Sequence, residues 1–418
     1  MGLSSHPSQI EPKRFNRKTQ GEHVMDFEFS PEEQAFAAEV SAYLQEVHSD
    51  DVMQPWKENF TQLVDTAPKR AFMKKLGEKG WLGITWPKEL GGQEGSGISE
   101  YLLNEALAYV GAPQIGKGVG IIGKTLIRHG SDKLKAEFLP KILCNDVEFA
   151  VGYSEPQAGS DAANMQLRAD KVEGGYNLNG QKIWTTSAHF ADWYWVGART
   201  NQEVKKHAGI SLFMIPMNEK GLEIQSMPCI GGDQTNQVFF TDVFVPDEYM
   251  VGDEGKGFGY ISEALDLERF TMFTFSPILA RFELLLDYVK NSKKDGELRK
   301  DDPVVRREIA QLATQHEVAR VLGLRFVAAA KEVDAKPPTL EASQYKLFAT
   351  QLSQRSVNKG LDIMGSEGQL RLDDPHAPQK GRFDSAYRAT VVETIGGGSS
   401  EIQKNIIARR GLGLPKNF

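Results

Sequence analysis

An acidic residue interrupts an apolar stripe between Phe258 and Phe275, where its position could support acid–base chemistry. Helical spacing of three and four residues places these apolar side chains on one stripe: Ile261, Ala264, Leu265, Met272, Phe275 and Leu279. Glu268 stands in the middle of the stripe, and no residue three or four positions away from it is a cation. Because burial disfavours a charged carboxylate, we expect a raised pKa that suits a general base or acid near neutral pH. The alternative is an ion pair between Glu268 and an Arg or Lys of another helix.

The segment Gly118–Thr125 is a second candidate for chemistry, because it matches the P-loop pattern and also contains GxGxxG. A P-loop binds phosphate with backbone amides that lie between a buried strand and a helix. Here residues 98–110 have helical spacing, no apolar strand leads into the glycines, and no βαβ unit surrounds them. We therefore favour a glycine-rich link between helices over the alternative of a P-loop nucleotide hydrolase.

The composition argues against several classes of protein. A chain of 418 residues can form two or three domains, and its net charge of −7 argues against nucleic acid as a partner. Cys144 and Cys229 lie far apart, so we expect no metal site, no disulfide and a reducing, cytoplasmic compartment. No apolar run is long enough for a membrane span. Residues 1–25 are polar and lack an apolar run, so we expect a disordered tail rather than a targeting peptide.

The elements that must position the candidate residues begin with a helical region. Ser30, Pro31 and Glu33 have the types and spacing of a helix cap, a first-turn proline and the acid of a capping box. Further segments with helical spacing follow as far as about residue 145. We expect a helical domain over residues 26–147.

The spacing then changes to a period of two and later returns to helical. Strands are expected over 148–250, with a hairpin turn at Asn179-Gly180 and strands at Ile210–Pro216 and Gln237–Pro246. Helical spacing returns at Gly257, and loop-like breaks follow at residues 295–303 and 373–381. The order is helical, then β, then helical over 251–418, which is an α+β organisation with several domains.

Four segments together resemble the acyl-CoA dehydrogenase family, in the family's order along the chain. They are Phe149–Asp161, Asn179–Thr186, Val243–Pro246 with Gly252–Phe258, and Gly398–Arg409. The likeness extends from about Phe27 to Pro415. The residues of these motifs are most similar to a bacterial branch of the family that includes dehydrogenases of bulky, cyclic or steroid side-chain CoA esters.

This resemblance implies a fold and a reaction. The implied fold is an N-terminal helical domain, a middle β-barrel or sandwich domain and a C-terminal four-helix bundle. The implied cofactor is FAD, and the reaction removes two hydrogens from an acyl-CoA to give a 2,3-enoyl-CoA. A carboxylate takes the α-proton, while flavin N5 accepts the β-hydride. The resemblance also implies a tetramer that passes electrons to an electron-transfer flavoprotein.

The resemblance places the catalytic base on the interrupted stripe. In many members the acid directly precedes a Gly-Thr or Gly-Ser pair near the C-terminus, and Gly397 stands at that position here. A minority, typified by isovaleryl-CoA dehydrogenase, carries the acid on a bundle helix within Leu-Asp-Leu-Glu-Arg, which Leu265–Arg269 matches. Glu268 is therefore the expected base, and Gly397 would leave room for a branched or cyclic acyl group.

The other expected site residues follow from the matched motifs. The residues expected to bind FAD are Tyr153, Ser154, Ser160, Trp184, Thr185, Thr186, Gly398, Ser399 and Glu401. Of these, Trp184 would form an aromatic wall against the flavin ring, and Glu401 would bind the ribose of the adenosine part. The residues expected to contact the CoA substrate are Ser160, Asp266 and Arg269. The alternatives are a core position for Trp184 and an exposed polar pair for Asp266 and Arg269.

Two positions depart from the family's pattern. Ser292–Gly296 replaces an Arg followed by Phe-Gly, where the Arg meets the FAD of a neighbouring subunit, so that Lys293 or Lys294 would have to supply the charge. Asp362 replaces a Gln that contacts the flavin. A homotetramer and a mixed heterotetramer of two different chains both remain open, and so does a subunit that holds little FAD without its partner chain.

Overall fold

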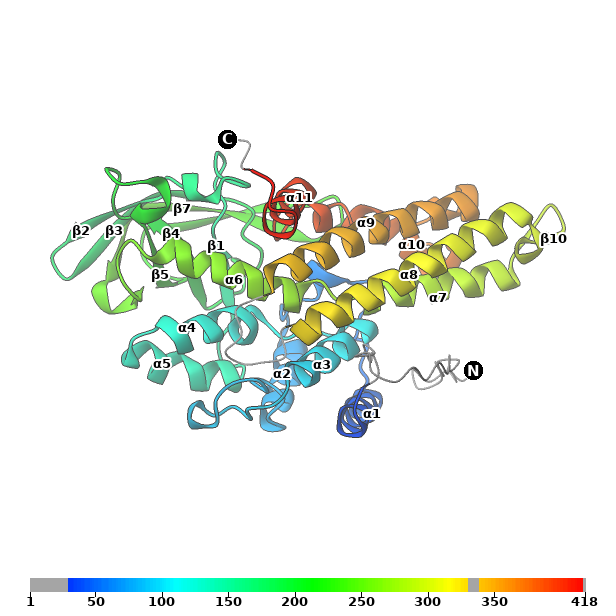
Figure 1. Cartoon of the computed structure of the whole chain (residues 1–418), viewed down its shortest axis with the longest axis horizontal. Helices are drawn as coiled ribbons and strands as arrows, with labels where there is room; N and C mark the ends of the chain where they lie inside the picture. Colours follow the sequence, from blue (N-terminus) through cyan, green and yellow to red (C-terminus); the bar gives the residue numbers. More distant parts are fainter. Residues whose placement is uncertain (1–28, 330–337, 416–418) are drawn as a thin grey trace.

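The computed structural model describes residues 29–329 and 338–415, and it describes residues 266–272 by their backbone only. The expected tail at residues 1–25 therefore lies outside the described residues. Figure 1 shows an elongated molecule with a sheet at one end, long helices at the other, and the N-terminal helices along one side. The predicted order of helical, β and helical regions is confirmed.

The N-terminal region is helical, as predicted. Its helices are α1 (Pro31–Glu46), α2 (Ala67–Glu78), α3 (Gly97–Val110), α4 (Lys124–His129) and α5 (Asp132–Leu143). The capping box at the start of α1 is confirmed, because the Glu33 amide donates to Ser30 Oγ at 3.2 Å and the Ser30 amide donates to Glu33 Oε2 at 2.7 Å. These bonds satisfy amide groups that the first helical turn leaves unpaired.

The P-loop-like segment is helical. Gly118–Gly123 forms a wide helical turn that continues directly into α4, so the expected link between helices is itself part of a helix. The amine of Lys124 forms an ion pair with the buried Glu100 at 2.6 Å. No strand precedes the segment among the described residues, which removes the geometry that phosphate binding requires.

One mixed sheet forms the middle of the chain. Its strands are β1 (Phe149–Gly152), β2 (Arg168–Val172), β3 (Gly175–Lys182), β4 (Trp193–Arg199), β5 (Ile210–Pro216), β6 (Leu222–Pro228), β7 (Gln234–Pro246) and β8 (Met250–Val251). They are ordered β6-β7-β3-β2-β4-β5-β8, and β1 pairs in parallel with β4. The two strands predicted from alternation correspond to β5 and β7, which confirms them.

The predicted hairpin turn at Asn179-Gly180 is wrong. Both residues lie inside β3, where the pairing with β7 shifts register between Leu178 and Gly180 to form a bulge. The Asn179 side chain pairs with Asp242 across this bulge, donating to Asp242 Oδ1 at 2.9 Å and accepting from its amide at 2.9 Å. The chain reverses instead before β3, at Gly174, whose φ of +75° suits a residue without a Cβ.

Long helices form the C-terminal region. They are α6 (Gly257–Met272), α7 (Ser276–Asn291), α8 (Pro303–Ala329) and α9 (Thr339–Met364), followed by the shorter α10 (Arg382–Ala389) and α11 (Ser400–Ile406). The break predicted near residue 295 contains a small hairpin of β9 (Lys293–Lys294) and β10 (Glu297–Leu298). Among the described residues, no helix has the length and apolar character needed to cross a membrane.

Helix α6 joins two apolar cores. Ile261 and Ala264 belong to a core that the N-terminal helices share with the sheet, whereas Phe273, directly after the helix, belongs to the core of the bundle. Figure 1 shows α6 running from beside β4 and β5 toward α8 and α9. Because one core extends across the expected boundaries near residues 147 and 250, the division into domains stays a prediction.

Candidate active site

A cleft opens between the N-terminal helices and the start of the sheet. It is a shallow cleft lined by Asn59, Phe60, Gln62, Leu63, Val64, Gln114, Ile115, Gly116, Lys117, Ile121, Glu148, Phe149, Thr186, Ser187 and Phe190. One expected site residue, Thr186, is in this lining. The lining mixes apolar side chains with polar and charged ones, which can orient a small molecule.

The end of α6 and the C-terminal glycines meet at one side of this cleft. Phe60 packs edge-to-face against Phe273, with ring centroids 5.4 Å apart. A Cβ on Gly396 would lie 2.9 Å from Phe60, and a Cβ on Gly397, whose φ is +63°, would lie 2.9 Å from Phe273. Glycine is therefore required at both positions by the aromatic pair, which brings the segment expected to lack the acid close to the helix expected to carry it.

A buried lysine fixes this arrangement from the bundle side. Lys346 of α9 donates to the carbonyl oxygen of Gly398 at 2.7 Å, and its amine lies 5.1 Å from the centre of the Phe273 ring. Gln403 donates to the same carbonyl at 3.0 Å. The glycine run is thus held in place by α9 and α11.

Trp184 presents its ring to solvent at the end of β3. Its side chain is 60% exposed, and its φ of +60° is rare for a large residue. Thr185 anchors it, because that residue is fully buried and its hydroxyl lies 2.8 Å from the hydroxyl of Tyr194. Asn236 completes the anchor by accepting from the Thr185 amide and donating to the Thr185 carbonyl, both at 2.9 Å. Trp184 is therefore not a core residue.

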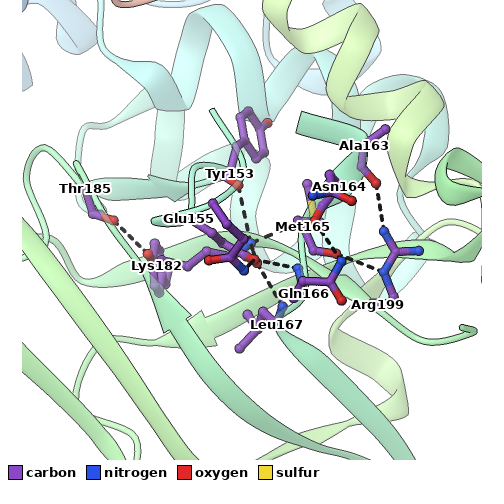
Figure 2. A network of polar contacts seen from close by, with 12 residues as sticks. Tyr153, Glu155, Ala163, Asn164, Met165, Gln166, Leu167, Lys182, Thr185 and Arg199 are labelled. Atoms are coloured by element: carbon purple, nitrogen blue, oxygen red, sulfur yellow. Dashed lines mark hydrogen bonds and ion pairs between the residues drawn. The ribbon is translucent and has the colours of Figure 1, made fainter. Parts of the chain in front are cut away.

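A buried ion pair secures the strand end that carries Trp184. Figure 2 shows the Lys182 amine directed at Glu155 Oε1, 2.8 Å away, within a network that reaches Tyr153 and Leu167. Glu155 also accepts from the amides of Gln166 and Leu167, and Lys182 donates to the Tyr153 carbonyl at 3.4 Å. Burial lowers the pKa of Lys182 to about 8, against the opposing pull of the Glu155 charge.

Sequence reasoning did not single out this pair. Lys182 follows the polar Gln181 and precedes Ile183, and Glu155 lies in a polar stretch after β1, so neither charge stands out as buried in the sequence. Their pairing depends on a contact between two separate segments, which local patterns do not encode.

The cleft itself holds groups of opposite charge. Lys117 donates to Ser187 Oγ at 3.1 Å and to the Thr186 carbonyl at 3.4 Å. Burial raises the pKa of Glu148 to about 7, although the charges of Arg70 and Lys117 oppose that rise.

A buried polar chain connects the cleft to the C-terminal segment. Gln114 Nε2 donates to Thr274 Oγ1 at 2.9 Å, and Thr274 Oγ1 donates to Asn59 Oδ1 at 3.0 Å. Asn59 Nδ2 in turn donates to Glu393 Oε1 at 2.5 Å. Periodicity could not reveal this chain, because its members come from distant parts of the sequence.

The remaining expected site residues fall into three places. Ser154 accepts from the Ile183 amide at 3.0 Å, beside Trp184, while Ser160 lies exposed in the loop after β1. Ser399 caps α11 and Glu401 is exposed in its first turn, where its backbone amide and Ser399 lower its carboxyl pKa. The following residues lie on α6 but their side chains are outside the described part of the chain: Asp266, Glu268 and Arg269. No cluster of metal-ligating side chains occurs among the described residues.

Comparisons with known proteins agree with this organisation. Family models described as acyl-CoA dehydrogenase match in three parts, the N-terminal domain at residues 30–146, the middle domain at 150–243 and the C-terminal domain at 255–412. The acyl-CoA dehydrogenase FadE26 of Mycobacterium tuberculosis is 32% identical, over 83% of this chain and 88% of that protein.

Two solved structures are also similar. One, named the Tcur3481-Tcur3483 steroid ACAD, has a TM-score of 0.86 at 30% identity and covers 94% of this chain and 100% of its own. The other is the ChsE4-ChsE5 complex of Mycobacterium tuberculosis, with a TM-score of 0.83 at 29% identity over 94% of this chain and 100% of its own.

Proposed function

The chain belongs to the acyl-CoA dehydrogenase family, and from that premise we propose that Glu268 is the base that removes the α-proton of an acyl-CoA thioester. The protein is an oxidoreductase, and its cofactor is FAD. When bound, FAD supplies the acceptor for the β-hydride. The product of the proposed reaction is a 2,3-enoyl-CoA.

The observation that carries this proposal is the meeting of α6 with the glycine run beside the cleft. Phe273 follows the last residue of α6 and packs against both Phe60 of the cleft and the backbone of Gly397. Gly397 has no carboxylate to offer, and Glu268 lies on the helix that ends at this point. A base in an apolar site has the raised pKa that proton abstraction near neutral pH requires.

The surroundings of Trp184 fit a flat ring system. An exposed indole on a strained backbone, anchored by the buried Thr185, offers an aromatic face that a monomer alone leaves open to solvent. We propose that the FAD ring contacts Tyr153, Ser154, Ser160, Trp184, Thr185 and Thr186. Gly398, Ser399 and Glu401 would hold its adenosine part, and Ser160, Asp266 and Arg269 would contact CoA.

We propose a bulky, branched or cyclic acyl group as the substrate class. The space expected beside Gly397 is not open in the structure, because a Cβ on Gly396 or Gly397 would lie 2.9 Å from the ring of Phe60 or Phe273, respectively. The similar structure named a steroid ACAD supports the same class of substrate.

The test of the base is the Glu268→Gln variant. It should bind FAD as the wild type does but lose anaerobic bleaching of the flavin by acyl-CoA, because an amide cannot accept the α-proton; we expect a rate loss of about 10²–10⁴-fold. The panel of CoA esters should include straight, branched and cyclic acyl groups. Bleaching at the wild-type rate would remove Glu268 from the mechanism.

A matched control is available on the same helix. The carboxylate of Glu263 is already paired with Arg128 and with His129 Nε2 at 2.9 Å, so the Glu263→Gln variant should bleach at close to the wild-type rate. Loss of bleaching in both variants would indicate damage to α6 rather than loss of a base.

A second candidate function is a subunit that needs a different partner chain to complete its FAD site. Lys293 and Lys294 lie exposed in the β9–β10 hairpin, and the Asp362 side chain is 73% exposed, so all three are accessible to a neighbouring subunit. The similarity to the ChsE4-ChsE5 complex supports a mixed tetramer as the alternative to a homotetramer. The flavin content of the chain purified alone separates the two functions. We propose an electron-transfer flavoprotein as the electron acceptor in either case.

A further inference from the structure

The backbone segment that presents Trp184 is strained at two residues. Trp184 has a φ of +60° and Ser187 has a φ of +76°, a region that residues with a Cβ adopt at a cost in free energy. Residues in such conformations gather at functional sites, where the surrounding contacts hold them in place. Ser187 lines the cleft together with Thr186, so the strained segment 184–187 joins the exposed indole to the cleft.

The sheet fixes the first half of this segment. Thr185 is anchored to the hydroxyl of Tyr194 in β4 and to Asn236 in β7. At the other end, Ser187 is 4% exposed, and its carbonyl oxygen accepts from two amides of the turn that follows, at 3.0 and 2.9 Å. These bonds place the carbonyl of Ser187, while the direction of its side chain depends on the contact that its hydroxyl makes.

Lys117 supplies that contact from the N-terminal region. Its amine donates to Ser187 Oγ at 3.1 Å and to the Thr186 carbonyl oxygen at 3.4 Å. Lys117 directly precedes the helical turn Gly118–Gly123, so the two bonds connect the N-terminal helices to the strained segment at the cleft. A charged donor makes a stronger hydrogen bond than a neutral one. The amine therefore opposes rotation of Ser187 out of its left-handed conformation.

A second cation of the N-terminal region holds the residues that follow. Arg70 of α2 donates to the Phe190 carbonyl oxygen at 2.8 Å and pairs with Asp192 at 3.1 Å. Arg70 therefore fastens the end of the loop, whereas Lys117 binds the strained residue itself. Because the two contacts are separate, removal of the Lys117 amine should loosen residues 184–187 while the end of the loop stays in place.

We propose that Lys117 is a positioning residue for the cofactor, which holds residues 184–187 in the conformation that presents Trp184 to the FAD ring. This inference rests on the proposed function, since it takes Trp184 as a contact of the flavin. A segment that is ordered before the cofactor arrives loses less conformational freedom on binding, so the affinity is higher. Lys117 thus acts through Ser187 and not on the reacting atoms.

The first experiment measures the dissociation constant of FAD by diluting the holoprotein and following the released flavin by its fluorescence. Lys117→Met keeps most of the side-chain length and removes the donors, so the dissociation constant should rise about tenfold. Lys117→Arg keeps the charge and the donors and should stay within about threefold of the wild type. A dissociation constant of Lys117→Met within about twofold of the wild type would overturn the proposal.

The matched control is Lys124→Met, which removes a lysine from the other end of the same helical turn. The Lys124 amine pairs with Glu100, whose side chain is 1% exposed, so this variant should lower the melting temperature by leaving a buried carboxylate without its cation. Its dissociation constant for FAD should stay within about twofold of the wild type. An equal rise in the two Met variants would show general destabilisation and would overturn the proposal.

The second experiment changes Ser187. Ser187→Ala and Ser187→Gly both remove the hydroxyl, but glycine adopts a φ of +76° without the steric cost of alanine. The dissociation constant of FAD should rise about tenfold in Ser187→Ala and less than about threefold in Ser187→Gly. Equal values would show that the conformation of this residue does not matter to FAD, which overturns the proposal. The comparison decides the proposal even if Lys117→Met does not fold.

Hydrogen exchange followed by mass spectrometry reports on the segment without any turnover. The amides of residues 184–187 should exchange faster in Lys117→Met than in the wild type, while the rates at residues 190–192 stay the same, and unchanged rates throughout would contradict the proposal. If the FAD affinities follow the expected order but no acyl-CoA bleaches the flavin, the dehydrogenase proposal fails and this inference stands. If acyl-CoA esters bleach the flavin and Lys117→Met binds FAD as the wild type does, this inference fails and the proposed function stands.

Discussion

At the scale of single residues, the carboxyl group of Glu148 links the cleft to the stability of the protein. Its pKa is about 7 in the folded protein against an ordinary value of 4.5, because burial outweighs the charges of Arg70 and Lys117. The folded state therefore binds the proton more tightly than the unfolded chain does. The resulting stabilisation is complete below about pH 4.5 and is lost as the pH rises through about 7.

The Glu148→Gln variant should remove this dependence, since an amide does not ionise. Its melting temperature should exceed that of the wild type at about pH 8 and should approach it at about pH 5, measured by circular dichroism across that range. The control is Glu173→Gln, in the exposed turn between β2 and β3. Its melting temperature should change with pH in the same way as that of the wild type. A Glu148→Gln curve that also runs parallel would contradict the raised pKa.

At the residue scale the sequence located distinctive motifs, and the roles of their residues stay predictions; it could not show what the backbone conformation decides. The absence of an acid at Gly397 was readable, and the structure adds that Phe273 leaves no space for a Cβ there. Periodicity could not predict that Trp184 is exposed, because the alternation of a strand carries no information about a positive φ at the residue that follows it. The Gln62 amide donates to the carbonyl of Ala108, which lies 46 residues away, and no local pattern encodes that contact.

At the scale of elements, alternation and helical spacing identified most segments, and turn chemistry misled at one. Strand β5 matches its predicted range, because a run that is buried on both faces is continuous in the sequence. The dipeptide Asn179-Gly180 predicts a turn because it favours positive φ, but in the structure only Gly180 of the two has a positive φ, and it lies at a bulge in β3. The residue types alone do not distinguish a hairpin turn from a bulge within a strand. The pairing of β3 with β7 determines that a bulge forms here.

The Glu155–Lys182 pair gives a prediction at this scale, because it fastens the strand end that carries Trp184. Lys182→Met should lower the free energy of unfolding by about 3–5 kcal/mol, since it leaves a buried carboxylate without its cation. The free energy of unfolding should fall less in the double variant Glu155→Gln/Lys182→Met than in Lys182→Met, because the double variant leaves no buried charge. Urea unfolding checks both, and the ratio of FAD to protein reports whether the strand end still holds the cofactor.

A surface lysine on the neighbouring strand serves as the control. Lys171 of β2 pairs with Asp247, but its side chain is 55% exposed, so Lys171→Met should cost less than about 1 kcal/mol. The role of the buried pair is contradicted if the two lysine variants unfold at the same urea concentration.

At the scale of the whole molecule, a buried ion cluster fastens the N-terminal region to the helical bundle. Arg281 of α7 is fully buried, pairs with Glu58 and donates to Ser353 Oγ of α9 at 2.7 Å. Arg382 of α10 approaches the same carboxylate at 3.5 Å. Glu58 directly precedes Asn59, so the cluster also supports the polar chain that runs from the cleft to Glu393.

This cluster predicts that the N-terminal region and the bundle unfold together. Arg281→Met should destabilise the protein by about 3–5 kcal/mol, because the Glu58 carboxylate would stay buried with only the more distant Arg382 nearby. Urea unfolding followed by tryptophan fluorescence and by circular dichroism should give coincident transitions in the wild type, both shifted to lower urea concentration in the variant.

The control is Arg325→Met, which removes a half-exposed guanidinium 3.6 Å from Glu341. This variant should lower the free energy of unfolding by less than about 1 kcal/mol. If Arg281→Met shifts the transitions no further than Arg325→Met does, the ion cluster does not hold the two regions together. The cleft between the N-terminal helices and the sheet would then depend on apolar packing alone.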